Sequence, residues 1–176
     1  MRTRPCLLAM LVAVLTMAAQ QACCGAPFED RFATSASKAI GPFLVIGELS
    51  LLSNRKAAKP EIIQGAKALV ATALFTEVLK QAVREKRPYG GPPTSFPSGH
   101  ASAAFAMATV LADYKPHYKW PAYGAATIIA WSRMDVGAHH WHDVVGGAAL
   151  GYFTAKHFTN RALVISPRGI GYKWTW

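Results

Sequence analysis

Cysteine is missing from this chain beyond residue 26. Its three cysteines, Cys6, Cys23 and Cys24, all lie in or near an apolar stretch at the N-terminus. The rest of the chain therefore offers neither a disulfide framework nor a thiolate metal site. A chain of 176 residues can fold as one domain that buries roughly 70% of its unfolded surface, so packing alone must stabilise it.

Long hydrophobic runs are also missing. No segment contains 18 or more consecutive apolar residues. The uncharged, largely apolar stretch over residues 120–132 is too short to cross a bilayer, which needs about 20 residues. This absence favours a compact domain outside the bilayer, either surrounded by water or in peripheral contact with a membrane.

Acidic residues are few. Nine Asp and Glu stand against 19 Lys and Arg, which gives a formal net charge of +10. Arg2 and Arg4, at the very start of the chain, account for two of these charges. Such a balance favours anionic partners such as phosphate esters or anionic lipid headgroups. Nucleic acid is not an expected partner, because the sequence has no basic run and no recognisable nucleic-acid-binding motif.

The first residues have the pattern of a secretory signal. Two arginines precede the uncharged apolar stretch Cys6–Ala19, which is short for a membrane span. We predict a signal peptide over residues 1–26, one domain over residues 27–176, and hence an exported, periplasmic protein. Lipidation of Cys23 is an alternative. The cleavage site stays open among three residues, Ala22, Cys24 and Ala26.

Helical periodicity dominates the remainder of the chain. After Pro60, apolar residues recur every three or four positions, and Pro88 is expected to end this long helix. A shorter helical region over residues 28–53 is expected to break at Gly41-Pro42. Three further helices are predicted over residues 98–114, 122–134 and 141–158.

The C-terminus contains the one strand pattern. Four residues alternate there at a period of two, Ile170, Tyr172, Trp174 and Trp176. The predicted fold class is therefore all-α, a single helical bundle of about five to six helices with a short irregular or β-like C-terminal tail.

Three short blocks carry the residues that could perform chemistry. In chain order they are Lys80-x6-Arg87-Pro88, Pro97-Ser98-Gly99-His100 and Ser132-Arg133-x5-His139-x3-Asp143. Together they supply three cations, two histidines and one carboxylate. Such a set suits a doubly or triply charged oxyanion that is held for attack by an imidazole.

The spacing within the first two blocks suggests how they would hold an anion. Lys80 and Arg87 are seven residues apart, or two helical turns, and are expected to share a helix face. Ser98 and Gly99 lie where a loop enters a helix, and the free backbone N–H groups there would point at an anion. His100 in the first turn is a candidate general acid. A solvated charged face and an ordinary helix cap are the plain alternatives.

The third block pairs an imidazole with a carboxylate. His139 and Asp143 are four residues apart, which is one helical turn. Asp143 could accept the N–H of one imidazole nitrogen and leave the other nitrogen as a nucleophile. Arg133 would supply the third cation.

These blocks resemble the signature of the type 2 phosphatidic acid phosphatase superfamily, which also includes bacterial acid phosphatases and vanadium haloperoxidases. Every signature position matches, over about a third of the chain. The resemblance implies a hydrolase of phosphoric ester bonds, a metal-independent phosphatase with no cofactor. It would act on phosphate monoesters or pyrophosphates. Its substrate would be a small phosphate ester or a lipid such as phosphatidate, phosphatidylglycerol phosphate, undecaprenyl pyrophosphate or lipid A.

The resemblance also implies a role for each residue. His139 would attack phosphorus and form a phosphohistidine that water hydrolyses, while His100 would protonate the leaving oxygen. Lys80, Arg87 and Arg133 would stabilise the charge of the transition state. With both histidines near their ordinary pKa of about 6.5, the rate is expected to be bell-shaped, with its optimum at mildly acidic to neutral pH.

Two other functions stay open. A vanadate-dependent haloperoxidase would hold vanadate among the same three cations, Lys80, Arg87 and Arg133. A non-enzymatic periplasmic protein that binds anions or metals would use the cluster His139-His140-Trp141-His142-Asp143, whose spacing can place ligands on one helix face. For His140 and His142 the plain alternative is a pair of surface or supporting imidazoles, and we predict no metal site.

Overall fold

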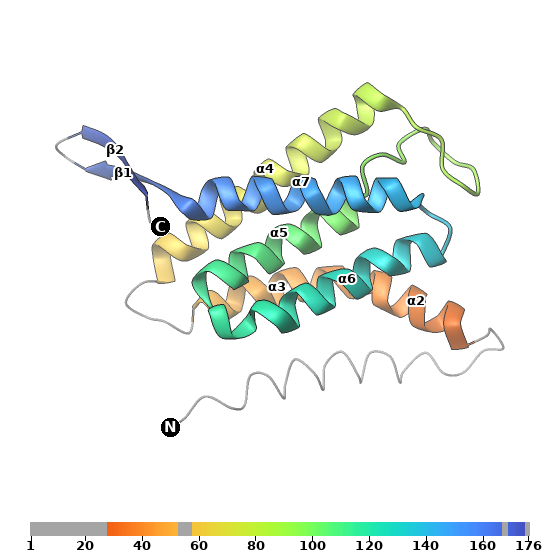
Figure 1. Ribbon diagram of the computed structural model, residues 1–176, viewed down its shortest axis with the longest axis horizontal. Coiled ribbons are helices and arrows are strands. Elements are labelled where there is room, and N and C mark those ends of the chain that lie inside the picture. The colour runs from red at the N-terminus through yellow and green to blue at the C-terminus, as the bar shows by residue number, and fades with distance from the viewer. Residues whose placement is uncertain (1–27, 53–57, 167–168, 175–176) are drawn as a thin grey trace.

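The computed structural model describes residues 28–52, 58–166 and 169–174, and most of these residues are helical (Figure 1). The described helices are α2 (Phe28–Lys38), α3 (Ile40–Leu51), α4 (Ala58–Val83), α5 (Gly99–Tyr114), the 3₁₀ helix η1 (Pro116–Tyr118), α6 (Lys119–Asp135) and α7 (Trp141–Asn160). The predicted helical bundle is therefore confirmed. The predicted signal peptide, residues 1–26, lies outside the described residues.

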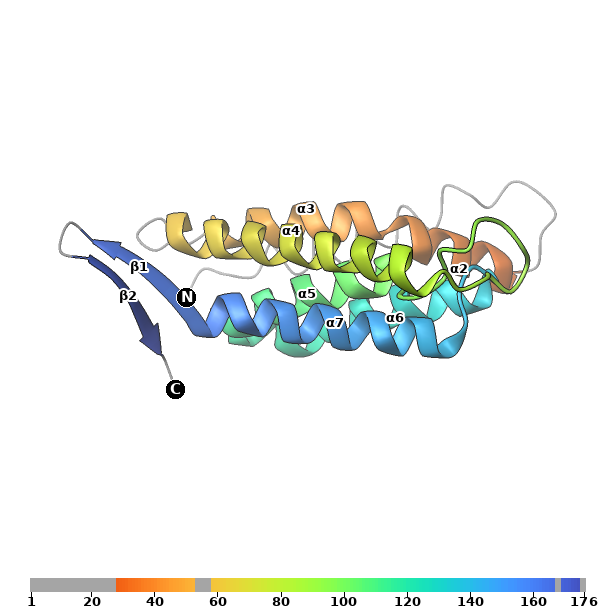
Figure 2. The ribbon, with the colours of Figure 1, turned by 90° about the horizontal axis from the view of Figure 1, so that it is seen from above.

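Helix α5 forms the centre of the bundle. It packs against α3, α4, α6 and α7, and Figure 2 shows α3 and α4 on one side of it and α7 on the other. Nine of its 16 residues are buried, and most of these are small. Because these small side chains extend only a short distance from the helix axis, four neighbouring helices can approach α5 closely.

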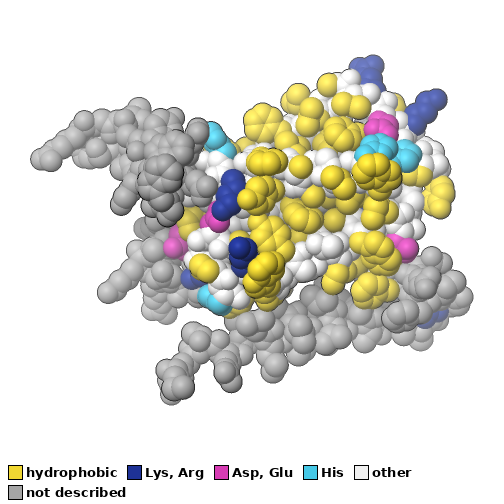
Figure 3. Space-filling model, in the orientation of Figure 1, with side chains coloured by type: hydrophobic (Ala, Val, Ile, Leu, Met, Phe, Trp, Pro, Cys, Tyr) yellow, Lys and Arg dark blue, Asp and Glu magenta, His cyan; other side chains and the backbone are white. Residues whose placement is uncertain are grey.

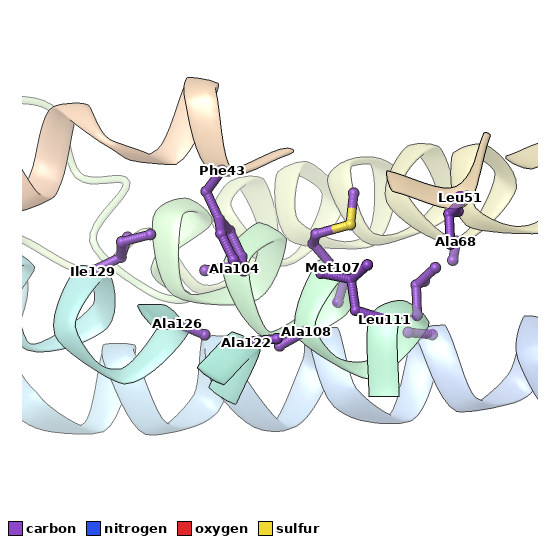
Figure 4. Close-up of a cluster of buried hydrophobic side chains, with 13 residues drawn as sticks. Phe43, Leu51, Ala68, Ala104, Met107, Ala108, Leu111, Ala122, Ala126 and Ile129 are labelled. Atoms are coloured by element: carbon purple, nitrogen blue, oxygen red, sulfur yellow. The ribbon is translucent and has the colours of Figure 1, made fainter. Parts of the chain in front are cut away.

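The main hydrophobic core surrounds the middle of α5. Met107 and Leu111 of α5 pack in one cluster with Phe43 and Leu51 of α3 (Figure 4). Alanines from the flanking helices complete this cluster, among them Ala68 of α4 and Ala122 and Ala126 of α6. Each large side chain buried here contributes about 1.5–3 kcal/mol of hydrophobic stabilisation.

Two glycines of α7 allow this helix to touch the backbone of α5. A Cβ added to Gly151 would lie 2.1 Å from the carbonyl oxygen of Ser102, and one added to Gly147 would lie 2.5 Å from that of Ser98. Because backbone atoms cannot move aside as the end of a side chain can, only glycine fits at either position. This contact fixes the start of α7 beside the start of α5.

We expect Gly151→Ala to lower the free energy of unfolding by about 3 kcal/mol, the upper end of the usual cost of overpacking. Gly124→Ala in α6 is the matched control, because no described atom lies within 4 Å of its added Cβ. There alanine is expected to stabilise the helix by roughly 0.5–1 kcal/mol. Denaturant unfolding in mild detergent, followed by circular dichroism, measures both. Equal stability of the two variants would contradict the close packing of α7 on α5.

The long helix α4 ends earlier than the sequence predicts. It stops at Val83 rather than at Pro88, because Arg84 adopts the left-handed conformation with φ of 52°. Arg87 consequently lies in the loop that follows. The prediction that Lys80 and Arg87 occupy one helix face, two turns apart, is therefore wrong.

The C-terminal tail is a β-hairpin. Strand β2 (Gly169–Trp174) contains the predicted alternating residues, and it pairs antiparallel with β1 (Arg161–Ser166). The register runs from Arg161 opposite Trp174 to Ser166 opposite Gly169. Strand β1 was not predicted, because it continues directly from α7 without a turn signal. Trp176 lies outside the described residues.

One face of the bundle is strongly apolar. In Figure 3 apolar side chains form a broad band across the middle of the molecule, and charged groups gather toward its two ends. Large exposed hydrophobic residues on α4 and α7 include Val70, Leu74, Phe75, Val78, Val145, Tyr152 and Phe153. A face of this kind is typical of a protein that contacts a membrane or a partner.

Among the described helices, one is long and apolar enough to cross a membrane, namely α4 over Glu61–Val83. Only 28% of its most apolar window is buried, whereas the core helix of a soluble protein is mostly buried. The apolar period of the sequence predicted this helix, but uninterrupted apolar runs were the criterion for a membrane span. Helix α4 was therefore missed as a candidate span, because Lys67 and Glu77 interrupt the run.

Candidate active site

The three predicted blocks meet at one end of the bundle. They lie where α4 and α6 end and where α5 and α7 begin, on the right in Figure 1. The charges of Lys80, Arg87 and Arg133 act on both His100 and His139. Segments far apart in the chain thus combine three cations and two histidines in one site.

Lys80 in the last turn of α4 and Arg87 in the loop that follows both contact the same residue, Thr94. Lys80 Nζ donates a hydrogen bond of 3.2 Å to the carbonyl oxygen of Thr94, and Arg87 Nη2 donates one of 3.5 Å to Thr94 Oγ1. The backbone N–H of Ser95 donates to the carbonyl oxygen of Glu85 at 2.9 Å, which closes the loop. The two cations therefore converge through the loop rather than through a shared helix face.

Ser98 presents a buried hydroxyl at the start of α5. It occupies the N-cap position, but its hydroxyl makes no capping hydrogen bond. Its Oγ is buried and has no hydrogen-bond partner within the described residues. A buried hydroxyl without a hydrogen-bond partner costs about 1–3 kcal/mol of stability. An oxygen atom of a bound ligand could accept a hydrogen bond from this hydroxyl. The first N–H groups of α5, on Gly99 and His100, lack helical acceptors and add donors for the same anion.

His139 and Asp143 are neighbours, although not on one helix. His139 lies in the loop before α7 and Asp143 in its first turn, so the predicted spacing of one helical turn is wrong. His139 Nδ1 is nevertheless 3.7 Å from Asp143 Oδ2, and both side chains are buried. Among the described residues His139 Nδ1 has no hydrogen-bond partner. The two side chains are therefore in contact, and a small movement of either one would bring Nδ1 within hydrogen-bond distance of Oδ2.

Ser95 holds the carboxylate of Asp143 in place. Ser95 Oγ donates to Asp143 Oδ2 at 2.5 Å, and the backbone N–H of His140 donates to the same oxygen at 2.8 Å. The backbone N–H of Ser98 donates to the carbonyl oxygen of Asp143 at 2.9 Å. Sequence reasoning missed Ser95, because it lies between the blocks and no spacing relates it to a residue 48 positions later.

Burial and the three cations lower the pKa of both histidines. The pKa of His139 falls to about 4, chiefly by burial and then by the cations, while Asp143 acts in the opposite direction. The pKa of His100 also falls to about 4, again by burial first and then by the same cations. An anionic ligand would oppose these cations and raise the pKa of His100. The premise that both histidines keep an ordinary pKa is therefore wrong for the site without a ligand, whereas the bell-shaped pH profile itself stays a prediction.

A cavity of about 390 Å³ opens beside His100 and Arg133. Its remaining walls are Thr34, Ser37, Lys38, Ile40 and Val136. Arg133 Nη1 donates a hydrogen bond to Ser37 Oγ, so α2 lines the cavity and also fixes one of the cations. The cavity has room for the part of a ligand that extends beyond the oxyanion.

A sequence profile described as the PAP2 superfamily matches residues 64–163. The matched segment is more than half of the chain and contains all three blocks.

Similar curated proteins include lipid A 1-phosphatases. The one from Porphyromonas gingivalis is 34% identical over 96 residues, which cover 51% of this chain and 21% of that protein. The one from Rhizobium etli is 31% identical over 98 residues, which cover 47% of this chain and 42% of that protein. The chain thus spans less than half the length of these relatives.

Two solved structures share the fold. The crystal structure of Aquifex aeolicus LpxE superposes with a TM-score of 0.60 at 24% identity, over 84% of this chain and 93% of that one. A transmembrane PAP2 type phosphatidylglycerolphosphate phosphatase from Bacillus subtilis gives a TM-score of 0.59 at 22% identity, over 85% and 86%. At these identities the likeness concerns the fold alone.

Proposed function

Because the chain belongs to the PAP2 superfamily, we propose that it is a phosphatase that hydrolyses phosphate monoesters or pyrophosphates through a phosphohistidine. The observation that carries this proposal is the convergence of three cations on the buried His139 and the half-buried His100. Lys80, Arg87 and Arg133 together can neutralise the equatorial phosphate oxygens, so the proposed reaction is independent of a metal.

In the first proposed step, Nε2 of His139 forms a bond to phosphorus while the bond from phosphorus to the leaving oxygen breaks. His100 donates its proton to that oxygen, so an alcohol departs as a neutral molecule. Asp143 accepts a hydrogen bond from Nδ1–H of His139 and stabilises the ring as it gains positive charge. The 3.7 Å contact between these two side chains supports this pairing.

In the second proposed step, water attacks the phosphorus of the phosphohistidine. His100, which lost its proton in the first step, now removes one from the water. The bond between phosphorus and Nε2 breaks, and its electron pair returns to His139. Inorganic phosphate is released. For a pyrophosphate substrate the first leaving group is a phosphate or phosphate ester instead of an alcohol.

We further propose that the substrate is a lipid phosphate and that the protein is exported and associated with a membrane. The curated relatives are named as lipid A 1-phosphatases, and one structural neighbour as a transmembrane phosphatidylglycerolphosphate phosphatase. The exposed apolar residues of α4 and α7 support contact with lipid. A signal peptide over residues 1–26 would direct the chain across the membrane.

Phosphate release in EDTA tests this proposal. The purified protein in detergent is offered phosphatidate, phosphatidylglycerol phosphate, undecaprenyl pyrophosphate, lipid A and, as a matched soluble control, glycerol 3-phosphate. We expect activity to survive the chelator and at least one lipid to be preferred over the soluble ester by about tenfold or more, because lipid chains supply binding energy that the ester lacks. Loss of activity in EDTA with recovery in Mg²⁺ would contradict the metal-independent mechanism. A preference for the soluble ester would contradict the lipid assignment.

A further inference from the structure

A second group of titratable side chains adjoins the proposed active site. It consists of Glu85 in the loop after α4, His140 before α7, and His142 and Asp143 in the first turn of α7. One ligand atom from each lies within 4.8 Å of every other. The mechanism above uses Asp143 alone of these four, so the other three side chains have no assigned role.

The geometry of this group is that of converging donors. His142 Nε2 lies 2.6 Å from Glu85 Oε1 and 3.4 Å from Asp143 Oδ1. His140 Nδ1 lies 3.3 Å from Asp143 Oδ2 and 3.5 Å from Glu85 Oε1. The rings of His140 and His142 stack with their centroids 5.1 Å apart. Two imidazole nitrogens and two carboxylates thus point at a common position.

Asp143 supplies an independent indication that a ligand belongs here. Its side chain is fully buried, and its Oδ1 has no hydrogen-bond partner among the residues that the structure describes. This orphaned oxygen faces His142 Nε2. The side chains of His140 and His142 are 36% and 42% exposed, so an ion could enter from solvent. A cation at this position would satisfy an oxygen that has no hydrogen-bond partner among the described residues.

The donor set fits a first-row transition metal. Zn²⁺ prefers four ligands drawn from imidazole nitrogen, thiolate and carboxylate oxygen, and this site offers two nitrogens and two oxygens. The two carboxylates would balance its charge. The cage beside it, with Lys80, Arg87 and Arg133, would repel the same ion.

We propose that Glu85, His140, His142 and Asp143 form a Zn²⁺ site that inhibits the enzyme. A metal bound to Asp143 would withdraw negative charge from the carboxylate that faces His139. The imidazole would lose the partner that orients it and that stabilises its positive charge during attack. The metal-binding half of the inference stands by itself, whereas the inhibitory half rests on the proposed phosphatase function.

The proposed site differs from the metal cluster that the sequence analysis considered as an alternative, residues 139–143. That cluster was a run of neighbouring residues and included His139. In the structure His139 is not a member of the group, and Glu85 from the loop after α4 takes its place. Only the folding of that loop against α7 brings the fourth ligand in.

Zinc binding and zinc inhibition are measured separately on the full chain in detergent. Calorimetric titration with ZnCl₂ is expected to show one high-affinity Zn²⁺ per chain, and Co²⁺ is expected to give the intense visible absorption of a four-coordinate site. Glu85→Gln and His142→Asn are each expected to weaken binding at least about 100-fold, since the loss of a ligand exceeds the cost of losing a supporting group. His157→Asn, at the exposed far end of α7, is the matched control and is expected to bind as the wild type does.

Phosphate release is then compared with and without Zn²⁺, each variant relative to its own rate in EDTA. We expect Zn²⁺ to slow the wild type and His157→Asn at least about tenfold, and to leave Glu85→Gln and His142→Asn unaffected at the same concentration. Absence of stoichiometric zinc, or binding that survives both substitutions, would overturn the site. Binding lost in the variants but without any effect on turnover would overturn the inhibition. Site-specific zinc binding by a chain without turnover on any phosphate ester would uphold the site and refute the proposed function.

Discussion

Replacing His139 by alanine is expected to lower phosphate release by at least about 10⁴-fold, because removal of a nucleophile leaves only the contributions of binding and charge. The substituted side chain is buried and its Nδ1 has no partner among the described residues, so few native hydrogen bonds are lost with it. Steady-state release from a short-chain phosphatidate in EDTA measures the change. A thermal melt of each variant separates loss of chemistry from loss of fold.

The control and a second readout make this prediction specific. His157→Ala removes an exposed imidazole far along α7 and is expected to keep wild-type turnover. Wild-type protein quenched during turnover of a ³²P-labelled substrate is expected to carry a label that survives base and is lost in acid, as a phosphohistidine does. His139→Ala is expected to carry none. Turnover by His139→Ala within tenfold of the wild type would remove this residue from the chemistry.

Replacing His100 by asparagine is expected to produce a loss that depends on the leaving group. For an alkyl phosphate, whose alcohol must be protonated, the rate is expected to fall by about 10²–10⁴-fold. For p-nitrophenyl phosphate the first step is expected to change by less than about tenfold, because nitrophenolate departs without a proton. Asparagine keeps a polar side chain at the start of α5 but cannot transfer a proton.

The same variant is expected to reveal the intermediate. Without His100 the attacking water has no base, so hydrolysis of the phosphohistidine slows while its formation from p-nitrophenyl phosphate continues. Rapid mixing is then expected to show a burst of about one nitrophenolate per chain. An equal loss on both substrates, with no burst, would instead assign His100 to phosphate binding.

The helices could be predicted because their signals are local. The apolar period after Pro60 predicts α4, and the Pro- and Gly-rich segment before Ser98 predicts the start of α5. The convergence of the three blocks could not be predicted from local signals. It was inferred from the residue types, which together suit one anion. The structure brings them to one end of the bundle, although Arg87 reaches it from a loop and His139 precedes its helix.

The features that were missed depend on tertiary contacts. The left-handed conformation of Arg84 ends α4 early, and no glycine or proline marks that position. Ser95 and Glu85 meet residues of α7 only because the loop after α4 folds against that helix. The exposed apolar side of α4 was missed for a similar reason. A count of consecutive apolar residues does not show which side of a helix its neighbours cover.

The three cations Lys80, Arg87 and Arg133 form the proposed phosphate site, and the position of this site relative to α4 determines how a lipid would reach it. The apolar stretch Glu61–Val83 has 23 residues and rises about 35 Å, close to the hydrocarbon thickness of about 30 Å. Lys80 lies in its last turn. If α4 crossed a bilayer, the phosphate site formed by Lys80, Arg87 and Arg133 would sit at the depth of the phosphate headgroups. A lipid would then arrive by lateral diffusion without leaving its leaflet. The rate would follow the surface density of substrate in two dimensions, so dilution with inert lipid would slow the enzyme while dilution with buffer would not.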